Sequence, residues 1–215
     1  MEKFCRRFLA KRKSGNSIDA PPHSFLWKTK RTSFRLRLES DDGTNRLTRE
    51  CVIALEASLR KISAQGRPLV ITGNENFFSA GAELTEIAAL DGPSAYEFSK
   101  MGQALMLAVE QFPAPVYAAI SGYCMGGGGL DLALACHLRL AAPNAVFGHR
   151  GAALGLITGW GGTQRLPRLV GKGIALEMFA AAEKVGALRA LEIGLVEGVV
   201  SDPVAEALRR LNAAV

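Results

Sequence analysis

The chain has 215 residues, of which 48% are hydrophobic and 21% are charged, a composition typical of a soluble globular domain with a substantial core. No apolar run approaches the ~20 residues that a membrane-spanning helix requires. The net charge of +6 is unevenly distributed along the chain. Residues 1–37 carry eleven Lys and Arg against Glu2 and Asp19, a local charge of +9, so the remainder carries −3. Composition therefore favours one globular domain that does not span a membrane and has a basic N-terminal segment.

Residues 1–32 are predicted to be a basic extension, and residues 33–215 to be one domain. Pro21 and Pro22 break any helix in the extension. A basic arm of this kind could contact nucleic acid, anionic lipid or ligand phosphates, act as a targeting segment, or be a poorly ordered or wrongly assigned start. The segment has no apolar core followed by a cleavage site, so we expect a cytoplasmic protein rather than a secreted one.

Cysteine and histidine residues are scattered along the chain. No C-x-x-C pair and no zinc-finger spacing is present, so buried thiols in a reducing compartment are expected, without a metal site. The residues concerned are Cys5, Cys51, Cys124, Cys136, His23, His137 and His149.

Hydrophobic periodicity predicts alternating strands and helices, which is typical of an α/β fold with crossover connections. Thr48 is the predicted N-cap of the first helix. Strands are predicted at residues 33–39, 68–72, 116–120, 138–141, 145–147 and 196–200. Helices are predicted at residues 48–63, 94–111 and 130–135, followed by two or three more that Gly171 and Gly194 separate.

A run of four glycines, Gly126–Gly129, follows a predicted strand and opens a helix. Backbone N–H groups at such a point suit an anion or an oxyanion that develops during a reaction. A P-loop would need Lys and Ser or Thr after the run, whereas Leu130 and Asp131 follow it. The spacing also does not fit a dinucleotide-binding fingerprint. An oxyanion hole and a flexible turn remain as interpretations.

Four ordered motifs resemble the enoyl-CoA hydratase/isomerase (crotonase) superfamily, and together they cover about residues 69–200. They are the segment 71–84 (ITGNENFFSAGAEL), the segment 115–136 with the glycine run, the segment 144–168 that contains GWGGTQRLPR, and the tail 190–200. The resemblance implies a layered crotonase-like β-sheet fold of repeated ββα units with surrounding helices. Family members usually continue for two or three helices beyond the position of Val215, so truncated C-terminal helices are expected.

The resemblance also implies an acyl-CoA thioester as substrate, with no cofactor apart from the coenzyme A that the substrate carries. The N–H groups of Ala82 and Gly128 would bind the thioester oxygen and stabilise an enolate. Gly127 is the alternative donor, because the run has one glycine more than the usual pattern. Residues expected to line the substrate site are Ala80, Gly81, Gly127, His149, Arg150, Gly151 and Trp160. The segment Asn45-Arg46-Leu47 is expected to help bind coenzyme A, and Glu83 to support the Ala82 loop.

The acid/base positions differ from those of the family's hydratases, which use two glutamates. Asp131 stands at the first position and is expected to carry the proton, while Gly151 stands at the second and has no carboxylate. A double-bond isomerase with one carboxylate therefore fits better than a hydratase. In relatives with glycine at the second position, such as the dihydroxynaphthoyl-CoA synthases, bicarbonate is thought to replace the missing group, and Arg150 or His149 could hold it. His149 is expected to be a wall residue of the pocket rather than the acid or base.

The leading hypothesis is an enoyl-CoA hydratase/isomerase-like enzyme that stabilises a thioester enolate. The alternative is a crotonase-fold protein that binds acyl-CoA with little or no catalysis. A nucleic-acid or membrane-binding module would leave everything from Leu69 onward unexplained, so neither partner is expected. The family resemblance implies a homo-oligomer, either a trimer or a hexamer.

Overall fold

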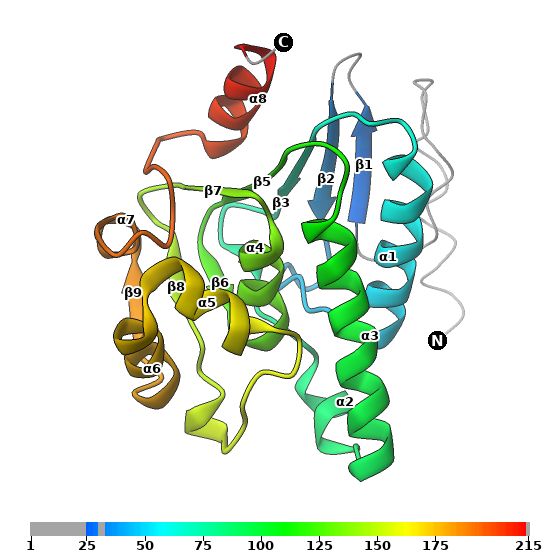
Figure 1. Cartoon of the computed structure of the whole chain (residues 1–215), viewed down its shortest axis with the longest axis vertical. Helices are drawn as coiled ribbons and strands as arrows, with labels where there is room; N and C mark the ends of the chain where they lie inside the picture. Colours follow the sequence, from blue (N-terminus) through cyan, green and yellow to red (C-terminus); the bar gives the residue numbers. More distant parts are fainter. Residues whose placement is uncertain (1–24, 30–32, 214–215) are drawn as a thin grey trace.

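The computed structural model describes residues 25–29 and 33–213 (Figure 1). Most of the predicted N-terminal extension therefore lies outside the described residues. Its last part contains strand β1 (Phe25–Thr29), which pairs antiparallel with β2 (Phe34–Leu38) at the edge of the larger sheet. The sheet thus begins inside the range that the sequence assigned to the extension.

The larger sheet has five strands in the order β1-β2-β3-β5-β7, and all neighbours after β1 and β2 pair in parallel. Phe34, Leu36 and Leu38 of β2 are buried while the residues between them are partly exposed, as the period-two pattern predicts. The remaining strands of this sheet are β3 (Leu69–Thr72), β5 (Val116–Ile120) and β7 (Leu138–Ala141). β3 and β5 are buried along their whole length, as expected for central parallel strands.

A smaller sheet is built from the strands that follow β3, β5 and β7 of the larger one, together with β9. Its order is β4-β6-β8-β9, parallel except for the last pair. Its strands are β4 (Phe77–Ser79), β6 (Tyr123–Met125), β8 (Val146–Gly148) and β9 (Lys184–Gly186). The passages β3 to β4, β5 to β6 and β7 to β8 are each followed by helices, which confirms the predicted repeat of ββα units.

Helices cover both faces of the larger sheet. The side chains of α1 (Arg49–Ser63), α3 (Gly92–Glu110) and α4 (Asp131–Ala135) join the main core, and α8 (Pro203–Ala213) packs against β3, β5 and β7 on the opposite face. The hydroxyl of Thr48 caps α1 as predicted, accepting a hydrogen bond from the N–H of Cys51. The other helices are α2 (Leu84–Ala88), α5 (Gly162–Val170), α6 (Lys172–Ala180) and α7 (Ala187–Glu192). Within the described ranges, none of the helices has the length and apolar character needed to cross a bilayer.

One predicted strand is wrong. Residues 196–200 form only an isolated bridge, between Val199 and Ala141 of β7. Gly194 turns the chain with a φ of 76°, and the segment then forms three backbone hydrogen bonds with β7, from Glu197 to Arg139, from Ala141 to Gly198 and from Val200 to Ala141. Val196 and Val199 of this segment pack into the core although the segment is a loop. The apolar sequence pattern therefore predicted the burial of the segment correctly but its pairing as a strand incorrectly.

The cysteines within the described residues are buried, as predicted, and Cys5 lies outside those residues. Cys51, Cys124 and Cys136 are buried. Burial raises the pKa of the Cys124 thiol well above its usual value and that of Cys136 to about 12. Both thiols therefore stay protonated near neutral pH and act as small apolar side chains.

Candidate active site

A cavity of about 510 Å³ lies between α2, α3, the glycine run and the segment from His149 to Trp160. Its walls are mainly apolar, and none of the described residues that line it is Asp or Glu. Seven of the predicted site residues line it, namely Ala80, Ala82, Gly127, His149, Arg150, Gly151 and Trp160. Gly81, Gly128 and Asp131 are fully or largely buried and lie outside the lining. The cavity thus gathers residues that are as far as 80 positions apart in the chain.

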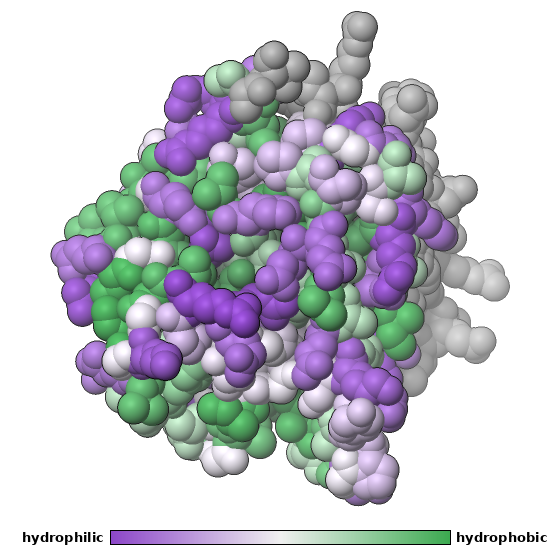
Figure 2. All heavy atoms as spheres, in the orientation of Figure 1, coloured by the Kyte–Doolittle hydropathy of each residue, from purple (hydrophilic) through white to green (hydrophobic). Residues whose placement is uncertain are grey.

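Large apolar side chains at the cavity wall also reach the surface. Leu84, Leu154 and Ile157 line the cavity and are 50%, 58% and 67% exposed. Figure 2 shows hydrophobic residues at the lower edge of the molecule, where Figure 1 places the loop after β8. Burying such side chains against an apolar ligand is favourable by about 25 cal/mol per Å² of apolar surface. The cavity therefore suits a ligand with an apolar portion.

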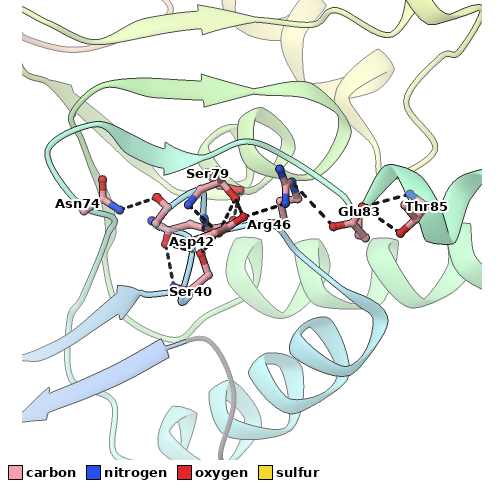
Figure 3. Close-up of polar contacts among 10 residues, drawn as sticks. Ser40, Asp42, Arg46, Asn74, Ser79, Glu83 and Thr85 are labelled. Atoms are coloured by element: carbon pink, nitrogen blue, oxygen red, sulfur yellow. Dashed lines mark hydrogen bonds and ion pairs between the residues drawn. The ribbon is translucent and has the colours of Figure 1, made fainter. Parts of the chain in front are cut away.

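The loop that carries Ala80, Gly81 and Ala82 is held by the turn from Ser40 to Leu47 (Figure 3). The backbone N–H of Ala80 donates to Thr44, and Leu47 exchanges hydrogen bonds with Gly81 and Glu83. The Ser79 hydroxyl donates to the carbonyl of Asn45 at 2.7 Å and accepts from the N–H of Gly81 at 3.1 Å. These bonds fix the position of the predicted oxyanion donor, Ala82.

Charged side chains tie the same two loops together at the surface. Figure 3 shows Arg46 between Asp42 and Glu83, at 2.8 and 3.8 Å. Hydrogen bonds from the backbone and hydroxyl of Thr44 lower the pKa of Asp42 to about 2. Glu83 caps α2, and the hydrogen bond from the N–H of Thr85 lowers its pKa as well. Glu83 therefore has the supporting role that the sequence predicted.

The glycine run forms a wide π-type turn, Gly126–Leu130, before α4. Gly128 has φ 124° and ψ −75°, a conformation that residues with a side chain rarely adopt. A Cβ at this position would lie 2.7 Å from the nitrogen of Ala82. The turn directs the carbonyl of Gly127 at the N–H of Ala82, which donates to it at 2.9 Å. In this structure the predicted oxyanion donor is therefore bonded to the protein's own backbone.

Behind the cavity wall lies a buried polar group formed by Asp131, Thr158 and His149. Asp131 is 0% exposed, and its Oδ2 accepts a hydrogen bond from the hydroxyl of Thr158. Its Oδ1 lies 3.8 Å from Nε2 of His149, which is 2% exposed. Thr158 and His149 line the cavity, so they stand between the carboxylate and any ligand. The sequence analysis did not single out Thr158, which lies within the matched segment 144–168 directly before GWGGTQRLPR.

The structure also explains why position 151 has no carboxylate. A Cβ on Gly151 would lie 2.6 Å from the carbonyl oxygen of Leu156, so a side chain there would require the backbone to move. The N–H of Leu156 donates to the carbonyl of Gly151 at 2.8 Å, which fixes this close approach. A second glutamate of the family's hydratase pattern therefore cannot be introduced at this position without rebuilding the loop.

Trp160 forms part of the cavity wall, and its position depends on Gly102 of α3. Trp160 is 2% exposed and stacks obliquely on Phe98, with ring centroids 5.2 Å apart. A Cβ at Gly102 would lie 2.2 Å from the indole ring. We expect Gly102→Ala to lower the free energy of unfolding by about 1–3 kcal/mol, because overpacking outweighs the gain in helix propensity. Urea denaturation followed by circular dichroism measures this change.

Gly173→Ala is the matched control for this substitution. Gly173 also lies in a helix, α6, but a Cβ there would meet nothing within 4 Å. We expect the control to raise stability by about 0.5–1 kcal/mol, as alanine normally does in a helix. Equal stabilisation by both substitutions would show that Trp160 does not need the space above Gly102.

Comparison with known proteins identifies the family. The model of the enoyl-CoA hydratase/isomerase family matches residues 31–213. The chain belongs to this family. It is 46% identical over 131 residues to a probable enoyl-CoA hydratase of Bacillus subtilis and 44% identical over 133 residues to the crotonyl-CoA hydratase of Syntrophomonas wolfei. These alignments cover 60% and 61% of this chain and 50% and 51% of the relatives, so the chain spans about half the length of the curated relatives it matches.

Solved structures of this family confirm the crotonase fold. Pseudomonas aeruginosa DspI superposes with a TM-score of 0.85 at 35% identity, covering 93% of this chain and 77% of that one. An enoyl-CoA hydratase from Bacillus anthracis gives a TM-score of 0.83 at 34% identity, covering 89% and 76%. The sequence therefore predicted both the enoyl-CoA hydratase/isomerase family and the fold class correctly.

Proposed function

We propose that this protein binds an acyl-CoA thioester in the cavity and stabilises the enolate that forms when the α-proton leaves. The observation that supports this most directly is the juxtaposition of the Ala82 loop and the glycine run at one end of an apolar cavity. Each preorganised N–H donor aimed at a developing oxyanion lowers the barrier by about 3–4 kcal/mol. In the proposed reaction the carbonyl of Gly127 turns away, so that the Ala82 N–H can donate to the thioester oxygen.

Within the family we propose an isomerase-like reaction rather than hydration. A hydratase of the two-glutamate type needs two carboxylates to position water and move protons, whereas this site has Asp131 alone and no room for a side chain at Gly151. A double-bond isomerase needs only one group that takes a proton from Cα and returns it to Cγ. One acid/base centre next to an oxyanion hole is sufficient for that reaction.

Binding of acyl-CoA without efficient catalysis is the second candidate function. The hydrogen bond from the Ala82 N–H to Gly127 favours it, because a donor already bonded to the backbone adds nothing to transition-state stabilisation. The apolar cavity suits an acyl chain in either case. The two functions differ in whether the bound thioester loses its α-proton.

We also propose a homo-oligomer. Leu176 of α6 and Leu188 and Leu191 of α7 are 68%, 70% and 43% exposed. Figure 2 shows hydrophobic residues gathered on the side of the molecule where these helices lie. An apolar surface of this kind favours contact with another copy of the chain.

Solvent deuterium exchange tests the proposed reaction. Butyryl-CoA and octanoyl-CoA are incubated with the protein in D₂O, and mass spectrometry measures deuterium at the α-carbon. We expect exchange well above the rate without protein, and conversion of 3-hexenoyl-CoA to the conjugated 2-enoyl ester faster than hydration of crotonyl-CoA. Tight binding of all four esters by calorimetry with no exchange and no isomerisation would favour the binding protein instead.

A further inference from the structure

Two buried polar atoms face each other beside the cavity. Asp131 Oδ1 and His149 Nε2 are 3.8 Å apart, and neither forms a hydrogen bond within the part of the chain that the structure describes. Both side chains are at least 98% buried. A buried polar atom without a hydrogen bond costs about 1–3 kcal/mol, so folded proteins retain few of them. This pair needs an explanation other than stability.

The two residues occupy different layers of the site. His149 lines the cavity, whereas Asp131 lies behind it, is not itself a lining residue and contacts the lining residue Thr158. Nδ1 of His149 is on the side of Gly151, since a Cβ built on Gly151 would lie 3.7 Å from it. The ring therefore stands next to the position from which a second glutamate would act, with its other nitrogen toward Asp131.

Neighbouring groups restrict how the pair can be arranged. The hydroxyl of Thr158 donates to Oδ2 of Asp131 and accepts from the N–H of Trp160 at 3.3 Å, so Oδ1 remains for His149. The ring of Phe179 meets the imidazole edge-on, with centroids 5.0 Å apart. The arrangement leaves Nε2–H to donate to the carboxylate and Nδ1 to accept a proton.

We propose that His149 is the catalytic acid/base of this protein and that Asp131 acts through it as a positioning residue. The inference rests on the proposed enolate chemistry. It assigns His149 a role beyond that of the wall residue that the sequence suggested. The separation of 3.8 Å must shorten by about 1 Å for a good hydrogen bond, and catalytic hydrogen bonds are often long in the free enzyme.

The proposed step moves one proton. Nδ1 of neutral His149 takes the proton from Cα as the Cα–H bond breaks, and that electron pair forms the double bond between Cα and the thioester carbon. The carbonyl π electrons move to the oxygen, which the backbone N–H groups bind. The carboxylate of Asp131 stabilises the imidazolium through Nε2–H. In D₂O a solvent deuteron replaces the proton on Nδ1, and its transfer to Cα gives exchange. With a 3-enoyl ester the proton is delivered to Cγ instead: the Cβ=Cγ electron pair forms the new Cγ–H bond, the enolate double bond shifts to Cα=Cβ and the carbonyl re-forms, which gives isomerisation.

His149→Gln tests this role, because glutamine keeps an N–H that can reach Asp131 but has no basic nitrogen. We expect α-deuterium exchange into butyryl-CoA to fall by about 100-fold or more, with binding of butyryl-CoA retained in calorimetry. His137→Gln is the control. His137 is exposed, lies outside the cavity lining and accepts a hydrogen bond from the N–H of Val116 at 3.0 Å. We expect normal exchange in this control.

Chemical rescue separates proton transfer from filling of space. In His149→Gly, free imidazole should restore exchange, whereas pyrazole, a ring of similar size and much weaker basicity, should not. Equal rescue by both rings, no rescue by imidazole, or unchanged exchange in His149→Gln would overturn the role of His149. Exchange that depends on added bicarbonate and not on His149 would overturn it too. Binding without exchange in the wild type would instead overturn the proposed function, and the role of His149 with it.

Discussion

Replacing Asp131 by asparagine is expected to lower the rate of α-proton exchange by about a thousandfold. Asparagine has the same shape, and its oxygen can still accept the hydroxyl of Thr158. It has no negative charge, so it cannot stabilise an imidazolium at His149, and its amide group would favour the wrong tautomer of the ring. The rate is measured by deuterium incorporation into butyryl-CoA, and binding by calorimetry.

The same substitution is expected to leave the melting temperature equal to or above that of the wild type. Oδ1 of Asp131 is a buried carboxylate oxygen without a hydrogen bond, so a neutral amide removes a desolvation cost. Asp91→Ala is the contrasting control, because Asp91 forms the capping box of α3 with Ser94 and is not itself one of the residues that line the cavity. We expect Asp91→Ala to lose about 1 kcal/mol of stability with normal exchange. A lower melting temperature with normal exchange in Asp131→Asn would make Asp131 a structural residue.

The sequence predicted the elements whose pattern is long enough to carry information. The alternation of Phe34, Leu36 and Leu38 and the cap at Thr48 are both present in the structure. The strands of the smaller sheet, such as β4 and β6, have three residues each and show no period of their own. They form because the larger sheet and the glycine turns place them side by side. These strands therefore depend on tertiary contacts, which a local sequence pattern cannot predict.

In the candidate site, too, some features could be predicted from the sequence and others could not. Family motifs indicated the Ala82 loop, the glycine run and the segment from His149 to Trp160, and the cavity lies where these three meet. The partnership of Asp131 with Thr158 joins residues 27 positions apart and has no sequence signal. The direction of the Gly127 carbonyl could not be predicted either, because the number of glycines gives the length of a turn but not the orientation of its peptide groups.

Deleting one glycine from Gly126–Gly129 is expected to raise the exchange rate by up to about tenfold. All four possible deletions give the same chain, which then has the three glycines of the usual pattern. In the present structure the Ala82 N–H is bonded to Gly127 O at 2.9 Å, and the thioester oxygen must displace that carbonyl. A hydrogen bond of this type has a net value of about 0.5–1.5 kcal/mol, which corresponds to roughly a two- to tenfold change in rate. Deuterium exchange and the melting temperature are measured together.

A variant with a fifth glycine is the matched comparison, since it lengthens the same turn. If the carbonyl of Gly127 obstructs the oxyanion donor, shortening the run should speed exchange and lengthening it should slow exchange or leave it unchanged. Slower exchange in both variants, with folding intact, would mean that a run of four glycines is the productive length. The additional residue would then place the N–H of Gly128, the donor favoured by counting back from Asp131, where the thioester oxygen needs it. Exchange too slow to detect in the wild type but measurable after the deletion would identify the Gly127 carbonyl as the feature that separates a binding protein from an enzyme.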